Sequence, residues 1–254
     1  FTECTDDLNR VCTDLANCVG DTAIALATVS DDNAFFEVKG NYAKEMVTGF
    51  IRLNGATIGA VANRTEVYDE EGKLAEKFAA ALSVKGCNKA ADFIRFCDAF
   101  NIPVLSLTNA CGYEATVESE KEIAAAAARL TYAFASATVP KVNVIIGKAY
   151  GSAYVAMNSK AIGADITMAW PNAEIGCMDA NLAAKIMYEG QGAEVISEKA
   201  AEYEKLQNNV VSAAQRGYVD QIVEPADTRK YLIGAFEMLF TKSEDRPAKK
   251  HGTV

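Results

Sequence analysis

The sequence has a single histidine, a single tryptophan and five prolines among its 254 residues. With His251 alone, a mixed cysteine–histidine zinc site cannot be built, and no two of the seven cysteines have Cys-x-x-Cys spacing. We therefore expect no metal in this chain. An odd number of cysteines in apolar surroundings is typical of reduced thiols, which favours a cytoplasmic protein.

Long apolar runs are also missing, so the sequence predicts neither a membrane-spanning helix nor a signal peptide. Basic residues are outnumbered by acidic ones, 25 to 34, which gives a formal net charge of −9. Such a balance disfavours nucleic acid or an anionic membrane as the main partner. A local basic patch for a phosphorylated ligand remains compatible with it.

Half of the residues are hydrophobic, which is enough for a substantial core in one large domain or two small ones. Strand and helix patterns alternate between residues 103 and 169, and their connections are short. This alternation predicts an α/β fold. The expected order is strand (103–107), helix (119–136), strand (142–146), helix (153–159) and strand (165–169).

The clearest local signal is Asn54-Gly55, which predicts a tight hairpin between 46–53 and 56–62. The other expectations concern longer pieces of the chain. We expect a helical lead-in over 1–45 that starts with a helix inside 1–20, a charged irregular stretch over 64–82, helices over 88–100 and 194–214, and a mobile charged tail over 241–254.

The candidate site lies within 137–178, where Tyr150-Gly151-Ser152-Ala153-Tyr154 joins the strand at 142–146 to a helix. Small residues at such a turn let a ligand approach the backbone closely. The free N–H groups at the helix start would then stabilise negative charge on that ligand. This chemistry requires no acidic, basic or metal-binding side chain.

Other candidates are weaker. Ser152 as a nucleophile, in the manner of a Clp-type protease, needs a general base, and His251 lies in the tail. Cys111 lies on an exposed-looking loop and could be a nucleophile, but a lone buried thiol explains it better. Glu114 and Glu118 have no distinctive spacing for a hydratase acid–base pair, so solvated carboxylates before a helix explain them better.

Two residues near the turn, Lys148 and Asn109, each allow two interpretations. Lys148 contacts a phosphate or carboxylate, or it is a surface lysine at a strand end. Asn109 binds a ligand, or it closes its own loop as an Asx turn. Tyr150 and Tyr154 are expected to be wall residues that shape a pocket.

Two runs carry a family resemblance: NKAADFIRFCDAFNIPVLSL at 88–107 and ATVPKVNVIIGKAYGSAYVAMNSKAIGADITMAWPNAEIG at 137–176. They resemble the carboxyltransferase (beta-type) component of biotin-dependent acyl-CoA carboxylases and decarboxylases of the propionyl-CoA or methylmalonyl-CoA type. The likeness covers nearly the whole chain. Proteins of this family have two such domains, and this chain resembles only the C-terminal one.

The resemblance implies a crotonase-like (ClpP/crotonase) fold, a spiral of ββα units, with 1–254 as a single C-terminal-type domain. It implies transfer of a carboxyl group between carboxybiotin, on a separate carrier protein, and an acyl-CoA. Expected partners are the biotin carboxyl carrier protein, a biotin carboxylase component, an N-terminal carboxyltransferase domain that binds CoA, and further copies of the chain in a homo-oligomer. Because the sequence begins at Phe1 rather than a methionine, we expect a fragment of a longer protein or a processed product.

By the same resemblance, the backbone amides of Ser152 and Ala153 form an oxyanion hole for the ureido oxygen of biotin. The other biotin- or substrate-binding residues that it implies are Gly151, Tyr150, Tyr154, Val155, Asn109 and Gly112. Ser152 replaces a usual glycine, and Val155 stands where relatives often carry an acidic residue. Three alternatives therefore stay open: a scaffold or assembly subunit with reduced activity, a decarboxylase that runs the transfer in reverse, and another acyl-CoA enzyme of this fold.

Overall fold

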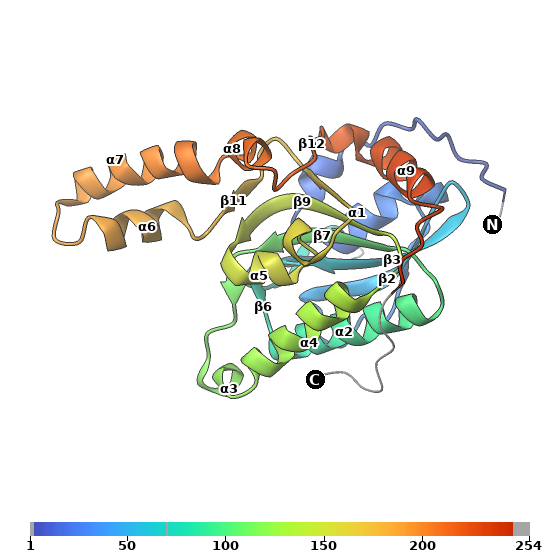
Figure 1. The fold of residues 1–254 in the computed structure, drawn as a ribbon, viewed down its shortest axis with the longest axis horizontal. Coiled ribbons are helices and arrows are strands. Elements are labelled where there is room, and N and C mark those ends of the chain that lie inside the picture. The colour runs from blue at the N-terminus through green and yellow to red at the C-terminus, as the bar shows by residue number, and fades with distance from the viewer. Residues whose placement is uncertain (1–2, 70, 246–254) are drawn as a thin grey trace.

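The computed structural model describes residues 3–69 and 71–245. A mixed β-sheet runs through its centre in the order β1-β2-β3-β7-β9-β10-β12, and β11 also pairs with β9 (Figure 1). The strands of this sheet are β1 (Phe36–Glu37), β2 (Met46–Leu53), β3 (Ala56–Asn63), β7 (Val104–Ala110), β9 (Lys141–Tyr150), β10 (Ile166–Ala169), β11 (Glu174–Gly176) and β12 (Gln221–Ile222).

The expected hairpin at Asn54-Gly55 is confirmed. β2 and β3 pair antiparallel with Leu53 opposite Ala56, and both turn residues have positive φ, 49° and 74°. From β3 onward the strands β3, β7, β9, β10 and β12 run parallel to one another. Parallel strands need crossover connections, and the helices between them supply these.

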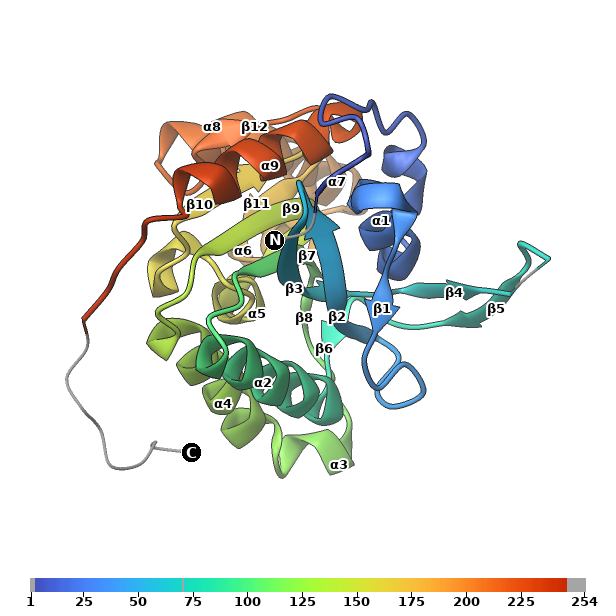
Figure 2. The same ribbon diagram turned by 90° about the vertical axis from the view of Figure 1, so that its right-hand side faces the viewer.

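Helices cover both faces of the sheet (Figures 1 and 2). The helices α1 (Thr22–Val29) and α9 (Thr228–Met238) lie on one face, and α2 (Val84–Ala99) and α4 (Ile123–Ser136) lie on the other. The remaining helices are α3 (Val117–Glu120), α5 (Gly151–Ala156), α6 (Ala180–Met187), α7 (Ala193–Tyr203) and α8 (Val210–Gln215), with short 3-10 or π turns at Leu15–Cys18, Asp31–Asn33, Lys160–Ile162, Glu204–Asn208 and Pro225–Asp227.

Burial on both faces explains the apolar runs of the central strands. In β3, Ala60 and Ala62 belong to the core cluster with α1 and α9, while Val61 between them belongs to the cluster with α2 and α4. Every residue of β7 is buried. A parallel sheet sandwiched between helix layers requires this pattern.

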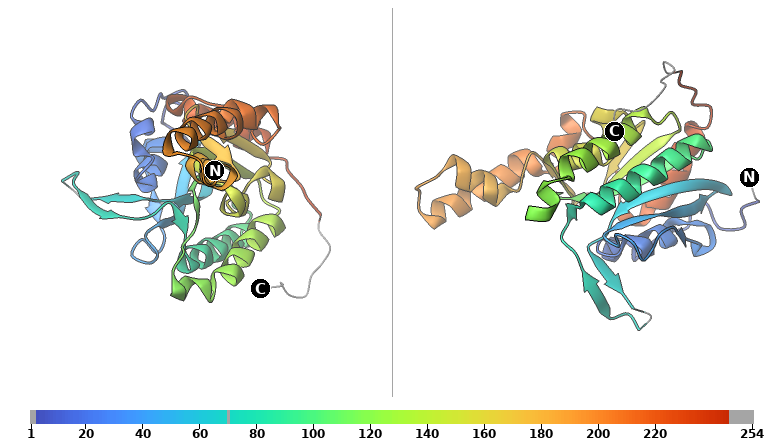
Figure 3. Two further views of the ribbon diagram at one scale, coloured as in Figure 1. Left: turned by 90° about the vertical axis from the view of Figure 1, so that its left-hand side faces the viewer. Right: turned by 90° about the horizontal axis from the view of Figure 1, so that it is seen from below.

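Two elements project from the body. The helical arm of α6 and α7 extends away from the sheet (Figures 1 and 3). A hairpin of β4 (Glu66–Tyr68) and β5 (Leu74–Lys77) extends in another direction (Figure 2). The hairpin returns to the body through β6 (Ala81–Leu82), which pairs with β8 (Gly112–Tyr113). Among the helices described, none combines the length and apolar character needed to cross a membrane.

Three helix expectations are corrected. The helix expected inside 1–20 is absent from its described part apart from the turn Leu15–Cys18, because Leu8 and Val11 are exposed instead of forming an apolar face. The helix expected over 119–136 is divided: Thr116 caps the separate single turn α3, and the long helix α4 begins at Ile123. The stretch expected as a helix over 194–214 breaks at Asn209.

The break at Asn209 has a local cause. Its backbone is extended, it forms a bridge with Glu174, and its side chain caps α8 by accepting the amide hydrogen of Val211 at 2.8 Å. The preceding Asn208 donates to the carbonyl oxygen of Met178. The chain is therefore pinned beside β11 and cannot stay helical. Of the expected tail, 246–254 lies outside the described residues.

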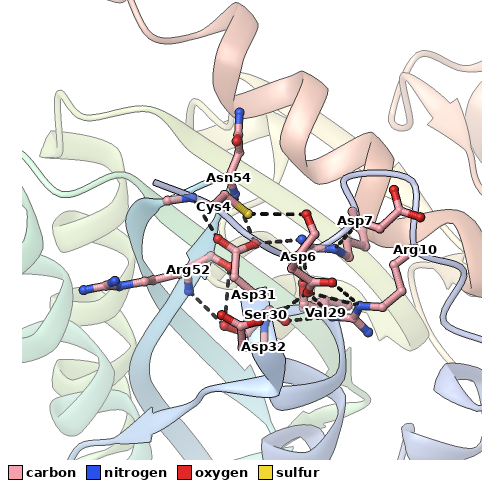
Figure 4. Close-up of polar contacts among 12 residues, drawn as sticks. Cys4, Asp6, Asp7, Arg10, Val29, Ser30, Asp31, Asp32, Arg52 and Asn54 are labelled. Carbon is pink, nitrogen blue, oxygen red and sulfur yellow. Dashed lines mark hydrogen bonds and ion pairs between the residues drawn. The ribbon is translucent and has the colours of Figure 1, made fainter. Parts of the chain in front are cut away.

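A buried arginine holds the N-terminal segment to the body. Two of the carboxylates beside it, Asp6 and Asp31, are labelled in Figure 4. Arg229 of α9 is fully buried and donates to Asp31 Oδ1 at 2.7 Å and to the Val29 carbonyl oxygen at 2.7 Å. Its guanidinium also lies 3.4 Å from Asp6 Oδ2. Asp31 in turn accepts the amide hydrogen of Gly55 at 2.8 Å. We call Arg229, Asp31 and Asp6 the N-terminal clamp.

Candidate functional site

The turn at the end of β9 requires glycine. Gly151 has φ +58°, and a Cβ atom added there would lie 3.1 Å from the carbonyl oxygen of Cys177. A residue with a side chain would be strained by the left-handed backbone and crowded by that carbonyl. Since Gly151 is also the first residue of α5, strand and helix join without an intervening loop.

A cavity of about 330 Å³ lies over this turn. It is bounded by the ends of β9 and β8, the start of α5, and the segment between β11 and α6. The residues that line it are Cys111, Gly112, Tyr113, Lys148, Tyr150, Gly151, Ser152, Ala153, Cys177, Met178, Asp179 and Leu182.

The first turn of α5 has no side-chain cap. Tyr150 occupies the N-cap position, and no side-chain oxygen accepts its amide hydrogens. The first N–H groups of any α-helix lack partners within the helix. Ser152 and Ala153 of this turn line the cavity, so their amides are suited to bind an anionic oxygen there.

Two tyrosines form walls of the cavity. Burial raises the pKa of Tyr150 well above its usual value, and the hydrogen bond from its hydroxyl to the Glu174 carboxylate raises it further. Burial also raises the pKa of Tyr113, although a hydrogen bond with the Ser152 side chain acts in the opposite direction. Both phenols therefore stay protonated near neutral pH, and the Tyr150 hydroxyl already donates its hydrogen to Glu174.

Asn109 is a structural residue here rather than a wall of the cavity. Its side-chain oxygen accepts the backbone amide hydrogen of Lys148 at 3.0 Å, and its backbone N–H donates to Asn63 Oδ1 at 3.1 Å. A Cβ atom at Gly147 would lie only 2.7 Å from Asn109 Oδ1. These contacts join β3, β7 and β9 where the β7–β9 register shifts. Asn109 does not close its own loop as an Asx turn, because it belongs to β7 and its side-chain oxygen accepts from Lys148 of β9. The ligand role stays a prediction.

The structure thus brings together five of the eight expected site residues. Tyr150, Gly151, Ser152, Ala153 and Gly112 line the cavity, and Asn109 does not. The other two side chains belong to the core beneath α5: Tyr154 is buried in a cluster with Ile145 and Ala149, and Val155 packs against that cluster. Burial raises the pKa of Tyr154 to about 12.

Part of the cavity was not expected from the sequence. Tyr113 reaches it through the pairing of β8 with β6, and Cys177, Met178, Asp179 and Leu182 reach it from the segment that crosses Gly151. Asp179 carried one usable signal, because an aspartate before an apolar helix is a typical N-cap. Its side chain does cap α6, accepting the amide hydrogens of Asn181 and Leu182.

The rejected alternatives differ in where they lie. Glu114 and Glu118 line a separate depression of about 520 Å³, so they do not face the cavity over Gly151. Cys111 lines that cavity and is exposed, so the buried thiol expected from the sequence is wrong. Partial burial still raises the pKa of its thiol, which disfavours the reactive thiolate. Over the described ranges no histidine accompanies Ser152, and no three metal-binding side chains gather into a cluster.

Comparison with known proteins assigns the family. Residues 5–254 match the carboxyl transferase domain model. The chain belongs to the carboxyl transferase domain family. This is an enzyme family, and the match bears out the resemblance stated from the two sequence runs.

Several relatives cover most of this chain. It is 40% identical over 239 residues to the methylmalonyl-CoA carboxyltransferase 12S subunit of Propionibacterium freudenreichii subsp. shermanii, covering 91% of this chain and 44% of that protein. It is 41% identical over 229 residues to the propionyl-CoA carboxylase beta chain of Roseobacter denitrificans, covering 89% and 43% respectively. The carboxyl transferase domain of this chain spans about half the length of these curated relatives and corresponds to their C-terminal half.

A solved structure is similar over the whole chain. The crystal structure of transcarboxylase 12S superposes with a TM-score of 0.89 at 36% identity, covering 100% of this chain and 49% of that one. That structure is described as a hexamer assembly with methylmalonyl-coenzyme A bound. The likeness confirms the expected crotonase-like α/β fold.

Proposed function

We propose that this carboxyl transferase domain supplies the biotin-facing half of an acyl-CoA carboxyltransferase site. The observation that carries the proposal is the uncapped first turn of α5 beside the cavity over Gly151. A carboxylated biotin on a carrier protein would supply the carboxyl group, and its ureido oxygen would gain negative charge as that group leaves. Backbone amides at a fixed helix start stabilise such charge without reorganising.

The residues of the cavity suit this role. The amides of Ser152 and Ala153 would donate to the ureido oxygen, and Gly151 would let the ring approach the backbone. Tyr150 and Gly112 would form walls around it. Tyr154 and Val155 would act indirectly, through the packing of α5, since both belong to the core beneath that helix. Asn109 would act by fixing the backbone of Lys148.

The partners follow from the relatives. A domain that spans about half of a propionyl-CoA carboxylase beta chain would need the other half, an N-terminal carboxyltransferase domain, to bind the acyl-CoA. It would also need a biotin carboxyl carrier protein and a biotin carboxylase component. Assembly of several copies is proposed from the hexamer of transcarboxylase 12S. Seven free cysteines suit a reducing compartment such as the cytoplasm.

The direction of transfer is a separate question. The same amides would serve a carboxylase and a decarboxylase that runs the transfer in reverse, because the charge on the ureido oxygen is the same in both directions. Measuring the reaction from both the acyl-CoA and the carboxylated acyl-CoA distinguishes them.

The test removes one amide. Ala153→Pro deletes the N–H of the third residue of α5, which has no acceptor within the helix, and Ala153→Gly retains it. Carboxyl transfer from a carboxylated biotin carrier to propionyl-CoA would be measured with an N-terminal carboxyltransferase domain supplied. We expect Ala153→Pro to lower kcat about 100- to 1,000-fold and Ala153→Gly to lower it less than about fivefold.

Three outcomes would speak against the proposal. Equal activity of both variants would remove the amide from the mechanism. An inactive wild-type protein that still binds the biotinylated carrier would favour the scaffold alternative. Carboxyl transfer, hydration or other turnover of an acyl-CoA by this chain without any biotin would favour a different acyl-CoA enzyme of this fold.

A further inference from the structure

Of the residues described around the cavity over Gly151, Lys148 is the only lysine or arginine and Asp179 is the only aspartate or glutamate. The rest of the lining is backbone, apolar side chains, tyrosines, thiols and the Ser152 hydroxyl. The transferred group of the proposed reaction is a carboxylate. A site with a single cation offers that carboxylate a single charged partner.

The backbone of Lys148 is held rigidly. Its amide donates to Asn109 Oδ1 at 3.0 Å, and it lies within β9 opposite Glu174 of β11. Its ammonium lies 5.9 Å from the centroid of the Tyr150 ring, which gives the side chain a cation–π contact. The stem of this lysine is thus fixed two residues before the Tyr150–Gly151 junction.

The charged end of Lys148 is held loosely. Its Nζ lies 3.9 Å from Asp179 Oδ2, at the outer limit of an ion pair, and the two side chains are 44% and 41% exposed. An exposed pair of this kind contributes little. Asp179 Oδ1 is meanwhile occupied by the amide hydrogens of Asn181 and Leu182 at 3.0 and 3.3 Å. Asp179 is therefore committed first to capping α6.

We propose that Lys148 binds the carboxylate of the transferred group, exchanging its contact with Asp179 for one with the substrate. The inference rests on the proposed function and adds a specificity element to it: recognition of the carboxylated biotin over the uncarboxylated one. Asp179 holds the ammonium near the cavity when no substrate carboxylate is there. Because the carboxylate loses its charge when it leaves as CO₂, Lys148 stabilises the bound substrate rather than the transition state.

The test measures affinity without turnover. In the absence of acyl-CoA, surface plasmon resonance would compare binding of the carboxylated and the uncarboxylated biotin carrier to the same protein. We expect wild type to prefer the carboxylated carrier by about tenfold or more, as for a charge-assisted hydrogen bond. Lys148→Met should abolish the preference, and Lys148→Arg should retain most of it.

Two further variants sharpen the test. Asp179→Asn keeps a capping oxygen for α6 but removes the competing charge, so it should increase the preference for the carboxylated carrier. Lys185→Met is the matched control, since Lys185 is an exposed lysine of α6 outside the cavity lining. It should leave the preference unchanged. In the complete reaction, Lys148→Met should raise KM for the carboxylated carrier more than it lowers kcat.

The outcomes separate this inference from the function on which it rests. If wild type transfers carboxyl groups but the preference is unaffected by Lys148→Met, the role of Lys148 is overturned and the carboxyltransferase assignment stands. Equal weakening of both carriers by Lys148→Met would also overturn it, by showing a structural role. A wild-type protein that binds neither carrier would overturn both.

Discussion

At the scale of single residues, burial decides how much a charged pair contributes to the stability of the fold. Arg229 is fully buried, and its carboxylate partner Asp31 is nearly so. Lys230 and Asp227, three residues apart at the start of the same helix, are 43% and 35% exposed. A buried cation that loses its partner is costly, whereas an exposed pair contributes little.

Asp31→Asn tests the N-terminal clamp. We expect it to lower the free energy of unfolding by about 3 kcal/mol at pH 7, because Arg229 would remain buried without its main counter-charge. Chemical denaturation would measure this. Asp227→Asn is the control and should cost less than about 0.5 kcal/mol. Similar losses for both variants would show that the clamp does not stabilise the fold.

The stabilisation that Asp31 provides should depend on pH. Burial alone would raise the pKa of Asp31, but hydrogen bonds from the Gly55 amide and Arg229 lower it below its usual 3.8. A carboxyl whose pKa is lowered in the folded state contributes stability above its unfolded pKa, and loses it as pH falls through the folded pKa. The difference between wild type and Asp31→Asn should therefore shrink as pH falls below about 3.8.

At the scale of elements, a second buried cation joins α2 to the loop that precedes β2. Lys89 is 1% exposed, and its Nζ donates to the carbonyl oxygens of Tyr42 and Met46 at 2.7 Å and of Ala43 at 3.3 Å. Ala43 has a positive φ of 45°, which is unfavourable for alanine. The lysine thus holds a strained loop in place.

Lys89→Met should lower the free energy of unfolding by about 2 kcal/mol, since it takes the lysine donor from the carbonyl groups of Tyr42 and Met46, while that of Ala43 keeps the amide hydrogen of Met46. Hydrogen exchange of the loop before β2 should accelerate in this variant. Lys85→Met, on the exposed side of the same helix, should change neither property. Unchanged exchange in Lys89→Met would show that the loop holds its own conformation.

The accuracy of prediction from sequence also differed by element. Local signals were sufficient for the Asn54-Gly55 hairpin and for β9, which was expected over 142–146 and ends at Tyr150. They failed where a distant contact overrides a helical pattern, as at Asn209, which is pinned to Glu174 of β11. The charged stretch over 64–82 forms the β4–β5 hairpin because Gly20 and Asp21, far away in sequence, bind its base.

The candidate site was predictable to the extent that it is local. The turn from Tyr150 to Ala153 is contiguous in sequence and lines the cavity as expected. Lys148 and Asp179 are separated by 31 positions in the chain, and only the fold brings them within 3.9 Å. Tyr154 and Val155 were expected at the site but lie in the core beneath α5. The direction of α5 relative to the sheet decides this, and the local sequence does not specify that direction.

At the scale of the whole molecule, the domain accounts for about half of each relative's length. We expect this chain alone to bind propionyl-CoA weakly. Adding the N-terminal carboxyltransferase domain should make the binding tight. Isothermal titration calorimetry with and without that domain measures the difference. Tight binding of propionyl-CoA by this chain alone would instead favour a self-contained acyl-CoA enzyme.

The N-terminal clamp also has a consequence for biosynthesis. Arg229 bonds the carbonyl oxygen of Asp7 across 222 positions of sequence, and Asp31 across 198. Asp6, Asp7 and Asp31 leave the ribosome long before their arginine is translated, so they stay hydrated until α9 emerges. Domains that depend on such distant pairs complete their folding late. A nascent chain arrested before residue 229 should therefore keep its first segment accessible to protease.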